Sequence, residues 1–302
     1  MNGDRMIQSD AVVSSVRFLS GDRLAGACAD GKVRMWEARS GRLTKVVAQD
    51  PGDVAALVLD DAEVCAAIGS DGAVKIRDLR TGAIVQRHAG ANSKVMRLAA
   101  SRDGKIIAGF GPAAEKANDW TARLWDRTGK QRFAVPCGFG EVWATAISPD
   151  GATLAAGSWD TDIRIWNTGK GALVARIEEV TVSMFAMDFS PDGKVLAAAG
   201  ADRTVYLLDT KTWKVNRKLT GQTDAIVSIA FSKDGRRLAT GGFSAMAGRH
   251  PAQVVVWDVA SGAMVRSVTA PDAAWSVALS EDGALLASVT GDKTVALWDA
   301  KG

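Results

Sequence analysis

The chain has 302 residues, enough for two ordinary domains or for one all-β domain of unusual size. Its 37 basic and 34 acidic residues are mixed along the sequence and leave a net charge of +3. This mixture argues against a dedicated nucleic-acid surface, because such a surface needs clustered Lys and Arg. No apolar run approaches the roughly 18 residues of a membrane helix, and the first ten residues lack the apolar core of a secretion signal.

The cysteines indicate a reducing compartment. Cys28, Cys65 and Cys137 are odd in number and far apart, and the first two lie in apolar runs, where a buried, reduced thiol is the usual state. We therefore expect a soluble, cytoplasmic protein that does not bind membranes or nucleic acid.

One motif recurs along the whole chain: a short apolar run that ends in Trp, or in a residue at the same place, followed by an acid or an amide. In chain order the seven copies end at Trp36-Glu37, Arg77-Asp78, Trp125-Asp126, Trp166-Asn167, Leu208-Asp209, Trp257-Asp258 and Trp298-Asp299. Their spacings are 41, 48, 41, 42, 49 and 41 residues. A period of this length predicts a repeat architecture.

Each copy is predicted to form four short strands, called a, b, c and d in chain order. In the sixth copy the predicted strands are Ile226 to Phe231, Leu238 to Gly242, Val254 to Asp258 and Ala263 to Thr269. Tight turns are indicated by Gly, which adopts the positive φ that hairpins need. After strand a these turns are Asp103-Gly104, Asp150-Gly151, Asp192-Gly193, Asp234-Gly235 and Asp282-Gly283; after strand c they are Ser40-Gly41, Thr81-Gly82, Thr128-Gly129 and Ser261-Gly262.

Strand c has β-branched and aromatic residues on both faces and strand b is often apolar throughout, which is typical of short sheets that are covered on both sides. The last copy stops where its strand d should begin, whereas residues 4–8 precede the first strand a without a partner. We expect these residues to supply the outer strand of the last sheet, because pairing would satisfy an otherwise open edge.

The repeats resemble those of the WD40 family of β-propellers over essentially the whole chain. The resemblance implies an all-β fold: one seven-bladed β-propeller of four-stranded antiparallel blades, with the last blade closed by the N-terminal strand. A single domain of residues 1–302 is expected. Its predicted blades are near 11–50, 51–91, 92–138, 139–180, 181–222, 223–271, and 272–302 together with 3–9.

The family often ties each blade together with a hydrogen-bonded set: an Asp before strand c, a His after strand d, a Ser or Thr in strand b, and the Trp of strand c. The sixth copy has Pro251 in place of the Asp, and Gly221-Gln222 replaces a Gly-His pair. Thr240 and Ser288 are among the few strand b hydroxyls that remain. We therefore expect apolar packing to stabilise the blades, with the turn Asp bonding local amides. The Asp is kept at Asp30, Asp71, Asp119, Asp160, Asp202 and Asp292.

No constellation typical of an enzyme is present. With His88 and His250 as the only histidines, no multi-His metal cluster and no nucleophile paired with an oriented His are predicted, and no glycine-rich phosphate loop opens a helix. We expect no catalytic residue, no metal and no cofactor. A propeller hydrolase or lactonase remains an alternative by analogy of fold, because such enzymes place carboxylates around the central channel.

Two long connections between strands b and c distinguish one face of the predicted ring. They are Phe110 to Asp119 in the third copy and Phe243 to Gln253 in the sixth. Insertions on one face of a repeat array often mark the binding face. The resemblance implies that this face also carries the connections from strand d to the next strand a, and it is usually called the top face.

The residue after the first apolar position of strand a is expected near the channel mouth on the top face, again by resemblance. Four copies have a large soft or aromatic residue there: Met96, Trp143, Phe185 and Trp275. Candidate rim residues are Trp159, Asn118, Arg249 and His250. Two interpretations remain open: the aromatic residues plug the channel, or they form a recess that anchors a partner side chain. The recess would also suit a cation held against the ring faces.

The sequence thus favours a monomeric, non-catalytic scaffold that binds a protein or peptide at its top face. A stiff ring would present the loops of this face in a preorganised arrangement. The alternatives are the hydrolase or lactonase-like enzyme and a purely structural assembly module of a larger protein, which would expose an apolar patch on its side or bottom face.

Overall fold

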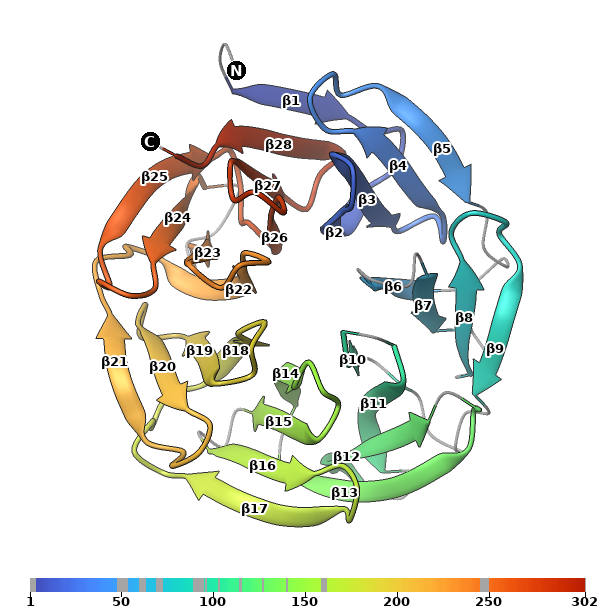
Figure 1. Ribbon diagram of the computed structural model, residues 1–302, viewed down its shortest axis with the longest axis vertical. Helices are drawn as coiled ribbons and strands as arrows, with labels where there is room; N and C mark the ends of the chain where they lie inside the picture. Colours follow the sequence, from blue (N-terminus) through green and yellow to red (C-terminus); the bar gives the residue numbers. More distant parts are fainter. Residues whose placement is uncertain are drawn as a thin grey trace.

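The computed structural model describes residues 4–47, 54–59, 64–68, 73–88, 95, 97–102, 104–113, 116–126, 128–139, 141–158, 162–244 and 250–301 (Figure 1). Within these ranges the regular structure is entirely β-strand. None of these segments forms a helix of the length and apolarity that crossing a membrane requires.

In the described ranges, the strands form seven four-stranded antiparallel sheets arranged as a ring, so the predicted seven-bladed β-propeller is confirmed (Figure 1). The first three blades comprise β2 (Val13–Leu19), β3 (Arg23–Cys28), β4 (Val33–Glu37) and β5 (Leu43–Val47); β6 (Val54–Leu59), β7 (Val64–Ile68), β8 (Val74–Asp78) and β9 (Ile84–His88); and β10 (Arg97–Ala100), β11 (Ile106–Ala113), β12 (Lys116–Asp126) and β13 (Gln131–Phe139).

The next three blades comprise β14 (Val142–Ile147), β15 (Thr153–Ser158), β16 (Ile163–Asn167) and β17 (Ala172–Ile177); β18 (Met184–Phe189), β19 (Val195–Gly200), β20 (Val205–Asp209) and β21 (Val215–Leu219); and β22 (Ala225–Phe231), β23 (Arg237–Phe243), β24 (Ala252–Asp258) and β25 (Met264–Ala270). The seventh blade comprises β26 (Ser276–Leu279), β27 (Leu285–Val289), β28 (Thr294–Asp299) and β1 (Arg5–Gln8). In the sixth blade, the predicted strand ends agree with the observed ones to within two residues.

Strand a is the innermost strand of each blade and strand d the outermost (Figure 1). Because neighbouring strands are antiparallel, the a-to-b and c-to-d turns lie at one face of the ring, and the b-to-c and d-to-a connections lie at the other. We call the second face the top face and the first the bottom face. Each face surrounds one mouth of the central channel.

The N-terminal strand closes the ring as predicted. β1 pairs antiparallel with β28, with Ile7 opposite Val295. Ile7 is buried and belongs to an apolar cluster that joins Leu297 of the seventh blade to Trp36 of the first. At the channel side of the same junction, the Val16 N–H donates to Ser276 Oγ at 3.2 Å. The first and last blades are therefore joined at both their inner and outer edges.

Apolar side chains between neighbouring blades form the core. Phe110 and Leu124 of the third blade, for example, pack in one cluster with Leu154 and Trp166 of the fourth. Strands b and c are buried on both faces because each sheet is covered by the next sheet around the ring. The sequence pattern that predicted two-sided burial is thus explained by blade stacking.

The turn before strand c is held by its Asp, as predicted, and in the first and fifth blades this Asp also binds a strand c side chain. Asp30 accepts from the Lys32 N–H at 3.2 Å, and it forms a two-pronged pair with the Arg34 guanidinium at 2.9 and 2.8 Å. In the fifth blade the Tyr206 hydroxyl donates to Asp202 at 2.6 Å. Asp71 and Asp160 lie outside the described residues, as does the side chain of Asp119.

The sixth blade contains a buried polar chain that the sequence analysis did not predict. The Trp257 Nε1–H donates to Thr240 Oγ1 at 2.9 Å, and the Thr240 hydroxyl donates to Gln222 Oε1 at 2.6 Å. The Gln222 amide in turn donates to the Gln253 carbonyl at 3.2 Å. Gln222 therefore accepts the hydrogen bond at the position where the resemblance led us to look for a His.

In the described part of the chain, four a-to-b turns share a Ser-x-Asp-Gly geometry. In the fourth blade, Ser148 Oγ donates to Asp150 at 2.5 Å and accepts from the Thr153 N–H at 2.9 Å, while Gly151 takes the positive φ of 71° that the reversal requires. The same serine-to-aspartate bond occurs at Ser190-Asp192, Ser232-Asp234 and Ser280-Asp282. This geometry fixes the residue between Ser and Asp at the bottom rim of the channel.

Because of these turns, we expect the free energy of unfolding to decrease at acidic pH. The Ser190 hydroxyl and the Lys194 N–H hold the pKa of Asp192 below its ordinary value of 3.8. A carboxylate with a lowered folded-state pKa contributes stability above its unfolded pKa and loses it as the pH falls through the folded value. We therefore expect wild type to lose more unfolding free energy between about pH 5 and about pH 3 than Asp192→Asn does. Denaturant unfolding at each pH measures this, and parallel curves for the two proteins would contradict it.

Candidate binding site on the top face

A β-bulge displaces one residue near the start of strand a in five blades of the described chain. The position after the first apolar residue, which the sequence analysis singled out, coincides with this bulge. The bulged residues are Ser14, Ala55, Trp143, Phe185 and Val227. A bulge re-aims its side chain and is frequent beside functional sites. In each of these blades the bulge lies at the top-face end of strand a.

The structure brings two of the predicted aromatic residues together. Trp143 of the fourth blade and Phe185 of the fifth have ring centroids 6.4 Å apart, with an interplanar angle of 74°. This edge-to-face geometry is favourable for aromatic pairs. Both residues are half-buried, so each keeps some solvent-exposed surface.

Two charged residues missed by the sequence analysis frame this pair. The Arg97 guanidinium lies 4.3 Å from the Trp143 ring centroid, and the Trp143 Nε1–H donates to Glu141 at 3.0 Å. Burial holds the pKa of Arg97 below its ordinary value, although the charge of Glu141 opposes this effect. The guanidinium remains a cation at any physiological pH. The fourth blade therefore presents an indole ring already held by a cation on its face and a carboxylate at its N–H.

The third predicted aromatic residue belongs to a second pair. Trp275 is 43% exposed, and its ring centroid lies 5.2 Å from that of Phe243, a residue that the sequence analysis placed only at the start of an insertion. Gly291 makes room for the indole: a Cβ at this position would lie 2.9 Å from Trp275 Nε1. The two aromatic pairs come from the fourth, fifth, sixth and seventh blades, with Val227 at the bulged position between them.

The side chains of most of the remaining predicted site residues lie outside the described structure. Met96, Trp159 and Arg249 lie outside the described residues, and Asn118 lies on β12 with its side chain outside the description. His250 is half-buried in the segment that precedes β24. Their predicted roles at the rim stay predictions.

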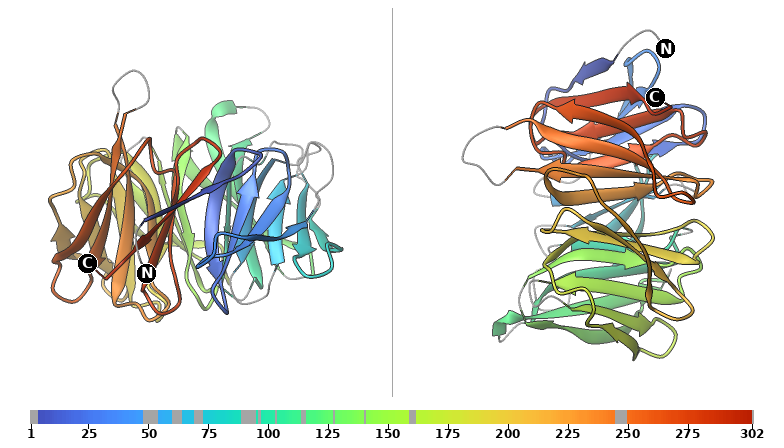
Figure 2. Two further views of the ribbon diagram at one scale, coloured as in Figure 1. Left: turned by 90° about the horizontal axis from the view of Figure 1, so that it is seen from above. Right: turned by 90° about the vertical axis from the view of Figure 1, so that its left-hand side faces the viewer.

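One expectation about the insertions needs correction. The segment from Phe110 to Asp119 was predicted as a loop, but β11 continues to Ala113 and β12 begins at Lys116, so the described part of the insertion is mostly a longer hairpin. Antiparallel pairing satisfies backbone groups that a free loop would leave to water. The ends of this hairpin and of β23 and β24 project from the same face of the ring, as predicted (Figure 2, left).

The histidines and carboxylates of the described residues form no metal-binding cluster. Within the described ranges, no group of three or more His, Cys, Asp or Glu side chains is placed to hold a metal ion. His88 is completely buried, and its ring lies 5.8 Å from that of Trp125. Burial lowers the pKa of His88, which favours a neutral core residue.

Comparisons with known proteins agree with the propeller fold. A family model described as "WD domain, G-beta repeat" matches residues 133–167, 178–209, 213–247 and 262–299. Similar curated proteins of Arabidopsis thaliana are DENN domain and WD repeat-containing protein SCD1 (30% identical over 166 residues), Autophagy-related protein 16 (27% over 167) and Guanine nucleotide-binding protein subunit beta (28% over 159). The matches cover 54, 55 and 48% of this chain, but 13, 32 and 40% of the three relatives.

Propellers of this kind typically serve as protein-interaction scaffolds and are typically non-catalytic. The matched segments begin on β13 of the third blade and extend into the seventh, and the first three blades have the same four-stranded arrangement in the described residues. Sequence period, blade topology and family match therefore agree: the chain is a seven-bladed β-propeller that contains WD40 repeats in four places.

Proposed function

We propose that this propeller is a non-catalytic scaffold that binds a protein or peptide partner at the top mouth of its channel. The observation that carries the proposal is Trp275, an indole that is 43% exposed while a second aromatic ring, Phe243, supports it from the side. Exposed Trp side chains are uncommon on surfaces that bind nothing, and Trp and Arg dominate the binding energy of interfaces.

The exposure of these rings favours a recess over a plug. Aromatic residues that only sealed the channel would be buried against one another, whereas Trp143 and Phe185 are half-buried and Trp275 is more exposed still. Trp143 and Phe185 sit on bulges of strand a, and Trp275 immediately precedes β26, so none of them depends on a long loop for its position. Rigid aromatic anchors bind with little loss of conformational entropy.

The chemistry of the mouth indicates the kind of partner. Arg97 already covers one face of Trp143, and Glu141 binds its N–H, so the free part of this mouth is mainly aromatic. We infer that the partner inserts an apolar or aromatic side chain, with polar contacts at the surrounding rim. A protein or peptide segment supplies such a side chain, and no cofactor is needed.

Substitution of the aromatic anchors tests this proposal. Partners captured from host lysate should be lost from Trp143→Ala plus Trp275→Ala, because each removed ring costs an interface about 2 kcal/mol or more. The matched control is Trp213→Ala, which makes the same change in the c-to-d turn between β20 and β21. Quantitative pull-down measures retention after circular dichroism confirms folding. Equal retention by wild type and the double variant would show that the aromatic mouth is not the binding site.

A further inference from the structure

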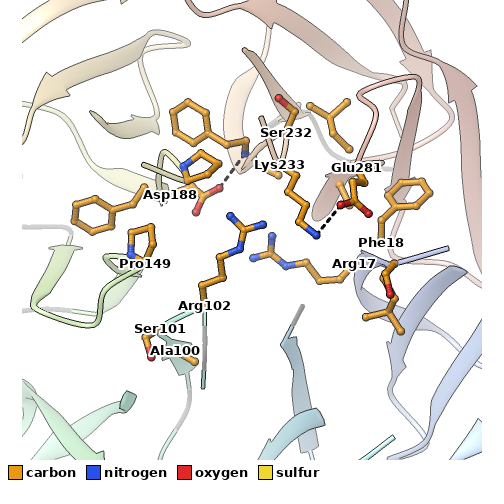
Figure 3. Close-up of a pocket in the computed structure, with 18 of the residues that line it drawn as sticks. Arg17, Phe18, Ala100, Ser101, Arg102, Pro149, Asp188, Ser232, Lys233 and Glu281 are labelled. Atoms are coloured by element: carbon orange, nitrogen blue, oxygen red, sulfur yellow. Dashed lines mark hydrogen bonds and ion pairs between the residues drawn. The ribbon is translucent and has the colours of Figure 1, made fainter. Parts of the chain in front are cut away.

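The bottom mouth of the channel contains a cavity that the proposed function does not use. Its volume is about 400 Å³, within the range of small-molecule sites (Figure 3). The described lining residues come from the ends of strand a and from the a-to-b turns of six blades. The cavity therefore lies at the opposite end of strand a from the aromatic residues of the top face.

The wall of this cavity departs from the repeat at two positions. Arg17 pairs with Ala25 and Asp188 with Ala197, at a strand a position where four other blades have alanine. These alanines are Ala99, Ala146, Ala230 and Ala278, paired with Ala108, Ala155, Ala239 and Ala287. Small residues at this level leave the space into which Arg17 extends. Every residue of β6, which is strand a of the second blade, is also uncharged, so five blades have an uncharged residue at this position and the ring does not require a charge there.

The rim adds further charge. The residue between Ser and Asp of the a-to-b turn is Arg102 in the third blade, Lys233 in the sixth and Glu281 in the seventh. Lys233 and Glu281 form an ion pair at 2.8 Å, and Asp188 accepts from the Phe231 N–H at 2.9 Å. Figure 3 shows Arg17 and Arg102 extending toward each other across the mouth, from blades that are not adjacent.

The cavity lining includes three cationic side chains, Arg17, Arg102 and Lys233, and two carboxylates, Asp188 and Glu281, so its net positive charge favours an anionic ligand. Each guanidinium donates two parallel hydrogen bonds to an oxyanion, and phosphate offers enough oxygens for two such groups at once. Beside the charges, Phe189, Phe231 and Leu279 give the cavity an apolar wall. Such a wall suits the carbon part of an organic phosphate.

We propose that the bottom mouth of the channel binds a phosphate monoester, with Arg17 and Arg102 holding the phosphate and the apolar wall contacting its organic group. The site is separate from the top face, so a small ligand or a phosphorylated partner binds there without competing for the aromatic mouth. The same chemistry is available from a free phosphorylated metabolite and from a phosphorylated peptide side chain.

Isothermal titration calorimetry with two probes distinguishes these sources. The first probe is phenyl phosphate, with phenol as its uncharged control; the second is a short peptide with one phosphoserine, with the unphosphorylated peptide as control. Tighter binding of phenyl phosphate assigns the site to a free ligand, and tighter binding of the phosphopeptide assigns it to a side chain. Either result supports the proposal, and failure of both probes to bind at millimolar concentration overturns it.

Variants connect the binding to the two arginines. Arg17→Ala and Arg102→Ala should each weaken the affinity for the bound probe by about tenfold or more, because each removes charge-assisted hydrogen bonds. Arg236→Ala is the matched control: it removes an arginine that is exposed on the bottom face in the a-to-b turn of the sixth blade, outside the cavity lining. Circular dichroism and thermal melting confirm that each variant folds. Unchanged affinity in both Arg17→Ala and Arg102→Ala would overturn the proposal even if the probes bind.

Discussion

Deletion of residues 1–8 is expected to lower the free energy of unfolding of the whole ring by about 3 kcal/mol or more. These few residues include the outer strand of the seventh blade, and without them β28 exposes an unpaired edge. The deletion also removes the buried Ile7 from the cluster that joins the first and last blades. Because a ring is held by every junction, opening one junction affects all blades.

The alternation of β1 provides matched substitutions for this prediction. Ile7 is buried and Met6 is 47% exposed on the opposite face of the same strand. Ile7→Asp should therefore approach the effect of the deletion, since it places a charge in an apolar cluster, whereas Met6→Asp should change stability by less than about 1 kcal/mol. Denaturant unfolding measures each difference. If the deletion variant unfolds at the same denaturant concentration as wild type, β1 does not hold the ring closed.

The fold could be predicted because its determinants are local and repeated. Each copy has its own turn residues and its own apolar runs, so errors in one copy are corrected by the others. The closing strand was predictable for a related reason. The seventh copy lacked a strand d and the N-terminal strand lacked a partner, so pairing the two completes the seventh blade. The third-blade insertion was wrongly predicted as loop because its pairing depends on hydrogen bonds within a single, unrepeated hairpin.

The candidate site was predictable only in part. The repeat placed Trp143, Phe185 and Trp275 at equivalent positions, but it could not show that Phe185 contacts Trp143 whereas Trp275 contacts Phe243. Such contacts depend on side-chain rotamers and on the spacing of neighbouring blades around the ring. Arg97 was missed because its role arises from a neighbour in the next blade.

The charged wall of the bottom cavity could have been found from the sequence. Arg17 and Asp188 are charged residues at a register position that is uncharged in the other five blades and is alanine in four of them, namely Ala99, Ala146, Ala230 and Ala278. Aligning the copies at every register position, and not only near the start of strand a, identifies both residues. The register itself is harder to obtain, because the first a-to-b turn is one residue shorter than that of the fourth blade.

Thr240→Val is expected to lower the free energy of unfolding by about 2 kcal/mol or more, although it preserves the shape of the side chain. Thr240 is completely buried and links Trp257 to Gln222. Its hydroxyl accepts from one neighbour and donates to the other, so the substitution leaves a buried N–H and a buried amide oxygen without partners. Thr269→Val is the matched control, because Thr269 is exposed on β25 of the same blade.

A double-mutant cycle between Thr240→Val and Gln222→Leu then decides how the sixth blade is stabilised. If Gln222 performs the role that the family usually gives to His, the double variant should cost clearly less than the sum of the single variants, because removing both partners leaves fewer buried polar groups unpaired. Additive effects would instead mean that the two side chains act independently. The sixth blade would then be stabilised mainly by the predicted apolar packing. The first outcome would show that this propeller has replaced the family's His in the sixth blade and kept the hydrogen bond that the His usually makes.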